Sequence, residues 1–165
     1  MRVCHAVNFV EFSIKSSAMS KEKRFWYLAG PMSGIPQFNF PLFEAAAEQL
    51  RVSGYNIISP VELDDKETRK CALASLTGAP GTDTPNGESW GTILSRDVKI
   101  IADQVRGIIF LPGWEKSRGA RLEAHVAILC GHVFRRYTLD NGKLWPVSMP
   151  ISTKNVKRIL FDVTN

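Results

Sequence analysis

The segment from Leu111 to Glu123, Leu-Pro-Gly-Trp-Glu-Lys-Ser-Arg-Gly-Ala-Arg-Leu-Glu, constrains the fold of this chain more than any other. The apolar run 105–111 predicts a buried strand, and the Pro-Gly pair predicts a turn. A helical pattern then begins near Ser117 and carries Glu123 inward, nearly two turns from the helix start. A strand, a loop and a helix in this order point backbone N–H groups and the positive end of a helix dipole at an anion. We therefore expect an anion site at Ser117 with a carboxylate beside it.

Strands and helices alternate along most of the chain. Besides the run at 105–111, apolar runs predict strands at 25–30, 55–59 and 132–135, and apolar residues at helical spacing predict helices at 40–50, 90–104 and 117–131. Near the end of the chain, 143–147 is interpreted as an edge strand and 152–161 as a short helix. This alternation predicts an α/β, Rossmann-like (flavodoxin-like) fold, with a parallel sheet of four to five strands and helices on both faces.

Three loops are expected to meet at one crevice. In open α/β sheets, ligands bind beyond the carboxyl ends of the strands, where the strand order reverses. This rule places the loops at 30–37, 60–89 and 112–118 around the same crevice. Residues 61–89 are polar and contain several glycines and prolines, so we interpret them as a long insert without regular structure that is functional or mobile.

The chain is long enough for one well-packed domain, which we place at residues 25–165. Residues 1–24 differ from the rest, because Glu11 interrupts the apolar stretch that a signal peptide would need. We interpret them as a poorly ordered or dispensable N-terminal extension. The functional alternative is an arm that covers a partner subunit.

The composition argues against several classes of protein. Hydrophobic residues make up 44% and charged residues 22%, as in ordinary globular proteins, and no apolar run approaches the roughly 20 residues of a membrane span. The net charge is +5, but the Lys and Arg residues are scattered, so we expect anionic small molecules as ligands and neither nucleic acid nor membrane as a partner. Three widely spaced cysteines indicate a reducing cytoplasm, and the three histidines lack metal-ligand spacing, so no metal is expected.

Three residues are candidates for chemistry. Glu123 lies on a helix face with apolar neighbours, where a carboxylate needs a partner or a function, although most helical glutamates are partly exposed. Asp97 lies on a second helix, where it either borders the crevice or pairs in solvent with Arg96 or Lys99. Tyr27 lies in the first strand, where a tyrosine is usually core, but its hydroxyl would reach the carboxyl end of the strand.

Three motifs together resemble the nucleoside 2-deoxyribosyltransferase superfamily: Tyr27-Leu-Ala-Gly-Pro-Met-Ser-Gly34, Arg96-Asp97, and Ser117-x5-Glu123 within the Pro-Gly-Trp-Glu segment. The resemblance covers residues 25–136. It is closest to the small DUF4406 branch, which is often encoded by phages or prophages, and it extends to the nucleoside 5′-monophosphate N-glycosidases of the superfamily. It implies an enzyme without a cofactor that forms a homodimer or a higher homo-oligomer, in the host cytoplasm where a phage encodes it.

The resemblance also implies roles for individual residues. Glu123 would be the nucleophile that attacks the anomeric carbon, Asp97 would contact the sugar or assist the leaving base, and Tyr27 would orient Glu123. Ser117 stands where monophosphate-specific members bind phosphate. The remaining substrate-binding and phosphate-binding candidates lie in the two glycine-containing loops: Gly30, Met32, Ser33, Gly34, Arg118 and Gly119.

The leading functional prediction is hydrolysis of the N-glycosidic bond of a nucleoside 5′-monophosphate. A nearby carboxylate favours breakage of such a bond, and a second carboxyl group can protonate the leaving base. Three alternatives stay open: base exchange by deoxyribosyl transfer, nucleotide binding or sensing without turnover, and cleavage of NAD or a nucleotide signal.

Overall fold

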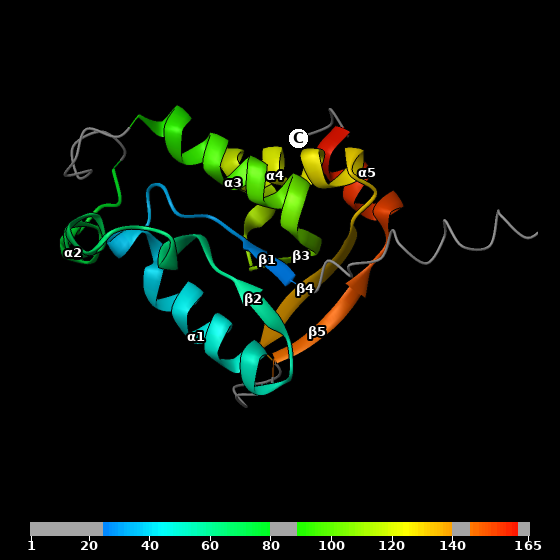
Figure 1. The fold of residues 1–165 in the computed structure, drawn as a ribbon, viewed down its shortest axis with the longest axis horizontal. Coiled ribbons are helices and arrows are strands. Elements are labelled where there is room, and N and C mark those ends of the chain that lie inside the picture. The colour runs from blue at the N-terminus through cyan, green and yellow to red at the C-terminus, as the bar shows by residue number, and fades with distance from the viewer. Residues whose placement is uncertain (1–24, 80–88, 140–145, 162–165) are drawn as a thin grey trace, which may run out of the picture.

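The computed structural model describes residues 25–79, 89–139 and 146–161, and the expectations for residues 1–24 lie outside this part of the chain. One sheet with the strand order β2-β1-β3-β4-β5 forms the centre of the molecule (Figure 1). Its strands are β1 (Phe25–Ala29), β2 (Asn56–Ile58), β3 (Val105–Phe110), β4 (Val133–Leu139) and β5 (Pro146–Ile151). The first four are parallel, which confirms the predicted α/β fold, and β5 pairs antiparallel with β4 at the edge.

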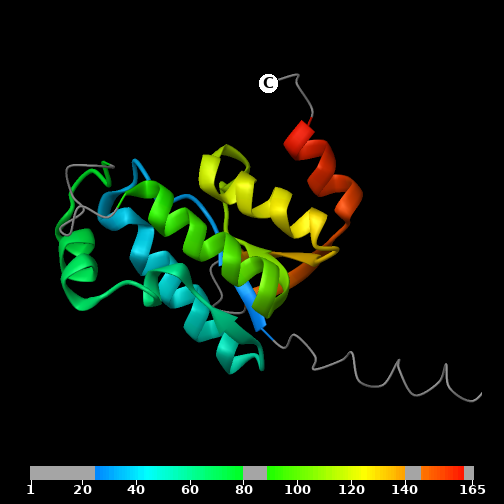
Figure 2. The same ribbon diagram turned by 45° about the horizontal axis from the view of Figure 1, so that its top comes forward.

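Helices cover both faces of the sheet, as Figure 2 shows. One face carries α1 (Phe40–Val52) and, beyond it, α2 (Lys66–Ala74), and the other carries α3 (Trp90–Gln104), α4 (Arg118–Leu129) and α5 (Thr153–Phe161). Three 3-10 turns, η1 (Pro36–Asn39), η2 (Pro60–Glu62) and η3 (Trp114–Lys116), lie in the connections. None of the helices in the described ranges is long and apolar enough to cross a membrane.

The central strands are buried on both faces, which explains their uninterrupted apolar runs. In β1, Trp26 and Leu28 pack with α1 in one core cluster, whereas Tyr27 and Ala29 pack in the other cluster with α3 and α4. Successive side chains of a strand point to opposite faces, so this alternation fixes the direction of Tyr27. The Tyr27 ring lies entirely within the core, on the face that carries Asp97 and Glu123.

Regular structure within 61–89 corrects the prediction of a long loop. The described part of this segment contains most of η2 and the nine-residue helix α2, in front of which Asp65 accepts hydrogen bonds from the backbone N–H groups of Glu67 (2.8 Å) and Thr68 (2.9 Å). This helix buries only Ala72, so its sequence lacks the apolar periodicity that identifies a helix packed on a core. Residues 80–88 and 143–145 lie outside the described part, which contains the edge strand from Pro146 to Ile151.

Candidate active site

A cavity of about 490 Å³ opens beyond the carboxyl ends of β1, β2 and β3. This volume falls within the roughly 300–1,000 Å³ of small-molecule sites. All three predicted loops contribute to it: Gly30, Met32 and Ser33 come from the first, Pro60, Asp64, Thr68, Ala72 and Ser89 from the second, and Ser117 from the third. Phe38 of η1, Phe40 of α1, the first half of α3 and the first turns of α4 complete the wall.

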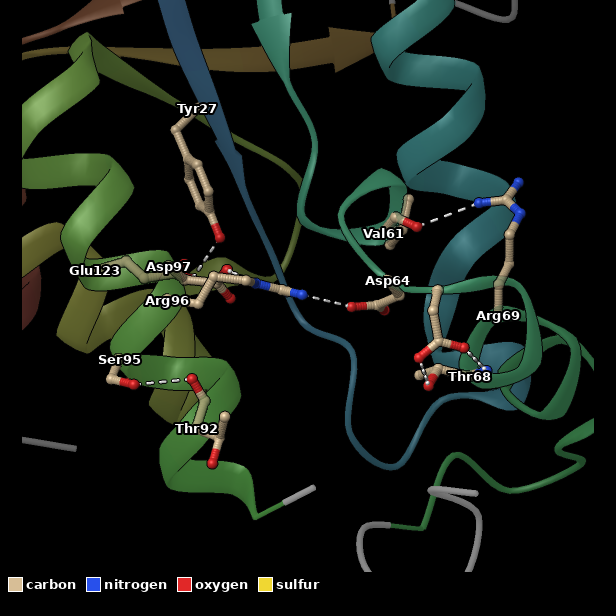
Figure 3. Close-up of polar contacts among 11 residues, drawn as sticks. Tyr27, Val61, Asp64, Thr68, Arg69, Thr92, Ser95, Arg96, Asp97 and Glu123 are labelled. Carbon is tan, nitrogen blue, oxygen red and sulfur yellow. Dashed lines mark hydrogen bonds and ion pairs between the residues drawn. The ribbon is translucent and has the colours of Figure 1, made fainter. Parts of the chain in front are cut away.

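Two buried carboxylates lie together in this cavity. Asp97 is 5% exposed and Glu123 is 8% exposed, and both line the wall. The Tyr27 hydroxyl donates a hydrogen bond to Oε1 of Glu123 at 3.2 Å (Figure 3). Tyr27 itself is not among the lining residues in the described ranges, so it supports Glu123 from behind. β1, α3 and α4 each supply one of these three side chains.

Burial and mutual repulsion set the charge of the pair. Burial, reinforced by the negative charge of Asp97, raises the pKa of Glu123 to about 8, although the hydrogen bond from Tyr27 acts in the opposite direction. Burial also raises the pKa of Asp97, and the neighbouring Arg96 guanidinium opposes that change. Glu123 therefore stays protonated to a higher pH than an ordinary glutamate does, and the two carboxylates titrate as a coupled pair of acids.

Arg96 connects Asp97 to the segment in front of α2. Its Nε donates a hydrogen bond to Oδ1 of Asp97 at 3.0 Å, and its Nη1 donates one to Oδ1 of Asp64 at 2.8 Å (Figure 3). Asp97 thus borders the crevice, and its pairing with Arg96 is buried rather than exposed to solvent as the other interpretation expected. The sequence reasoning missed Asp64, because a pair separated by 32 residues leaves no local pattern.

The start of α4 forms another part of the cavity wall. The Ser117 hydroxyl caps this helix by accepting a hydrogen bond from the backbone N–H of Ala120 at 3.3 Å. A Cβ built on Gly119 would meet no atom within 4 Å, so the first turn of α4 faces open space in the cavity wall. A helix N-terminus that opens into a cavity is a favourable place for a phosphate.

Gly34 and Arg118 are the predicted binding residues that do not line the cavity. Gly34 is exposed, and its N–H donates to the carbonyl oxygen of Gly78 at 2.9 Å, so this group closes the loop. Gly78 has a φ of +63°, and a Cβ there would lie 2.1 Å from the carbonyl oxygen of Ile35. Only glycine fits this contact between the first loop and the chain after α2. Arg118 is exposed on α4.

The apolar half of the cavity was also missed at the sequence level. It contains Phe38, Phe40, Ile93, Leu94 and Trp90, of which Trp90 is 54% exposed. Phe38 lies in a left-handed run in which Gln37, Phe38 and Asn39 have φ values of 56°, 47° and 60°. Such backbone is costly for residues other than glycine, and strain of this kind clusters at functional sites. The Asn39 side chain holds the run in place by donating to the carbonyl oxygen of Pro31 at 2.8 Å.

Fold and site together define an α/β protein with a flavodoxin-like strand order, whose cavity combines two buried carboxylates with a helix N-terminus. Within the described ranges, no three His, Cys, Asp or Glu residues are grouped so that they could hold a metal ion. Residues 24–135 match the model of a family described as a domain of unknown function (DUF4406), and the chain belongs to this family. No curated protein matches the chain.

Proposed function

We propose that this protein hydrolyses the N-glycosidic bond of a nucleoside 5′-monophosphate and releases the free base and a sugar phosphate. The observation that carries the proposal is the pair of buried carboxylates, Glu123 and Asp97, in one cavity with the N-terminus of α4. The resemblance to nucleoside 2-deoxyribosyltransferases agrees with it, because that resemblance rests on the same three side chains that meet at the site.

The first half of the proposed reaction uses one carboxylate and one proton. Glu123 in its ionised form attacks the anomeric carbon while the bond between that carbon and the base nitrogen breaks. The electron pair of the broken bond passes to the base, which takes a proton from Asp97. The products of this step are the free base and a sugar phosphate esterified to Glu123. The Tyr27 hydroxyl favours the ionised form of Glu123, because it donates a hydrogen bond to that carboxylate.

In the second half, water replaces the base. Asp97, now ionised, accepts a proton from the water as its oxygen attacks the anomeric carbon, and the ester bond to Glu123 breaks. Glu123 and the protonated Asp97 are thereby restored. A phosphate bound at Ser117 and Gly119 would hold the sugar through both halves, so that binding energy away from the reacting atoms orients them.

The proposal includes a homo-oligomer in the cytoplasm, as the resemblance implies. The outer face of α4 offers apolar surface for such an assembly: Leu122 is 38% and Leu129 75% exposed, on the same face as His125. Phe161 of α5, 53% exposed, packs edge-on against the His125 ring. Contiguous exposed apolar residues are typical of interfaces.

Incubation with ribonucleoside and deoxyribonucleoside monophosphates, nucleosides and NAD tests the proposal, with free base measured by chromatography. We expect base release from a monophosphate, and a loss of about 10³-fold or more in Glu123→Gln. Glu115→Gln is the matched control, because Glu115 is an exposed glutamate on η3, outside the cavity wall. Its activity should equal that of the wild type.

Each other outcome overturns the proposal in favour of one alternative. Base release that requires a second base would indicate a deoxyribosyltransferase. Release from NAD alone would indicate an NAD glycohydrolase. A monophosphate that binds but stays intact would leave a nucleotide-binding protein.

A further inference from the structure

In the reaction proposed above, the hydrogen bond from Arg96 to Asp97 opposes the protonation of Asp97 that the first step needs. The reactive form needs the proton on Asp97, yet a guanidinium 3.0 Å from Oδ1 of Asp97 favours the charged form of that carboxylate. The Tyr27 hydroxyl donates to Glu123 at 3.2 Å and lowers the pKa of both carboxylates. The Arg96 guanidinium contacts Asp97 and not Glu123, so it is the group that distinguishes the two coupled acids.

The position of the guanidinium is fixed from outside the pair. The Arg96 side chain is 29% exposed, and its second hydrogen bond runs to Asp64, whose side chain is 12% exposed. Asp64 directly precedes the residue that caps α2, and it shares the cavity wall with Thr68 and Ala72 of that helix. Arg69, on the same helix, donates to the carbonyl oxygen of Val61 at 3.2 Å (Figure 3) and pairs with Glu44 of α1.

We propose that Arg96 is a positioning residue that, anchored on Asp64, decides which of the two buried carboxylates carries the proton. The role in turnover rests on the proposed function, whereas the placement of the proton can be measured without substrate. The charged and titratable groups around Asp97 are Arg96 on its own helix, Asp64 in front of α2, Glu123 on α4 and Tyr27 on β1.

This arrangement predicts opposite effects for the two partners of the bridge. Arg96→Gln removes the cation beside Asp97, so the pH at which Asp97 titrates should rise by about one unit or more. Asp64→Asn removes a negative charge near Asp97 and keeps an oxygen that accepts from Arg96, so the same midpoint should fall by less than about one unit. Arg96→Lys keeps the charge without the two-armed geometry, and it should restore most of the midpoint.

The readout is ¹³C NMR of the side-chain carboxyl carbons in the whole protein, with Asp97 and Glu123 assigned through Asp97→Asn and Glu123→Gln. Lys99→Gln is the matched control, because Lys99 is an exposed cation one turn from Arg96 that pairs with Asp103. It should leave the Asp97 midpoint unchanged. Near-UV circular dichroism identifies any variant that loses its packing, and the Asp64→Asn and Arg96→Lys variants still decide the question if Arg96→Gln does.

Shifts of the same sign in Arg96→Gln and Asp64→Asn, or no shift in either folded variant, would overturn the inference. Where base release is measurable, the acid limb of its pH profile should move up in Arg96→Gln and down in Asp64→Asn. A wild type that releases no base but shows the NMR shifts would refute the proposed function and leave the role of Arg96 intact.

Discussion

Two arginines from outside the segment after β2, Arg51 of α1 and Arg96 of α3, attach this segment to the body of the molecule in different surroundings. Arg51, at the end of α1, donates to both carboxylate oxygens of Glu62, at 2.7 and 2.6 Å, and to the carbonyl oxygen of Ile57 at 3.0 Å. Arg96 makes single, longer bonds to Asp64 and Asp97. By geometry alone, the Arg51 pair is the stronger one.

Burial, rather than the geometry of the ion pairs, distinguishes the two places as candidates for a functional site. The side chains of Arg51 and Glu62 are 42% and 36% exposed, so water screens their attraction. Asp97 is buried beside a second carboxylate whose pKa is raised to about 8. A perturbed, buried acid in a cavity is the signature of a functional site, whereas a well-formed ion pair on the surface is not. Charge and residue type do not distinguish the two pairs, because both join an arginine to a carboxylate of the same segment.

The largest expected effect is a pH-dependent difference in stability between the wild type and Glu123→Gln. It is expected because Glu123 is buried, whereas Glu62 is exposed. The pKa of Glu123 is about 8 in the folded protein, against an ordinary value of 4.5. Between these values the folded state holds a proton that the unfolded chain has released, so the wild type loses stability as the pH rises through this window. Glu123→Gln lacks this loss. At pH 9 it should exceed the wild type in free energy of unfolding by several kcal/mol, and by much less at pH 4.

Urea denaturation at several pH values measures this difference. Parallel curves of stability against pH for the wild type and Glu123→Gln would show that Glu123 has an ordinary pKa. Burial would then not distinguish the acid near Arg96 from the exposed acid paired with Arg51.

A smaller effect is expected at Ser117, which belongs to neither arginine pair. Ser117→Asp keeps a residue that caps α4 well but places a negative charge where we propose that the phosphate binds. The value of kcat/KM for monophosphates should fall roughly 10- to 100-fold, as for a lost hydrogen bond to a charged group. Activity on nucleosides without phosphate should not fall. An equal loss on both substrates would show that Ser117 acts only through the helix.

The smallest effect belongs to the exposed pair. Glu62→Gln should change the free energy of unfolding by less than about 1 kcal/mol and leave base release unchanged, because exposed ion pairs contribute little to stability. Urea denaturation with the base-release assay measures both quantities. A loss of activity in this variant would mean that the position of the α2 segment depends on Arg51 as much as on Arg96.

The sequence predicted those parts of the site that depend on local patterns. The alternation of apolar runs and amphipathic segments predicted the α/β sheet, and Ser117 ahead of a helical pattern predicted the start of α4. The apolar neighbours of Glu123 indicated that it faces inward, and it is buried. These features follow from periodicity and capping, which act over a few residues and are visible in one sequence.

The missed parts depend on contacts between distant segments. Helix α2 buries a single residue, so no apolar stripe marked it, although Asp65 followed by Lys-Glu-Thr is an N-cap signal that identifies its start. The bridge from Arg96 to Asp64 spans 32 residues and leaves no local pattern. The hydrogen bond from the Gly34 N–H to the carbonyl oxygen of Gly78 could not be predicted either, because it joins two distant segments of the chain.

The wall formed by residues 60–79 is one continuous stretch of chain, whereas the side chains that we propose react come from β1, α3 and α4. This stretch meets the first loop through two backbone hydrogen bonds, from Gly34 to Gly78 at 2.9 Å and from Gln37 to Ser75 at 2.8 Å. An exchanged cassette that keeps Asp64 can therefore reshape the cavity while Tyr27, Asp97 and Glu123 keep their places. Because Asp64 holds Arg96 beside Asp97, the shape of the cavity can change separately from the paired acids only when that one residue of the cassette is retained.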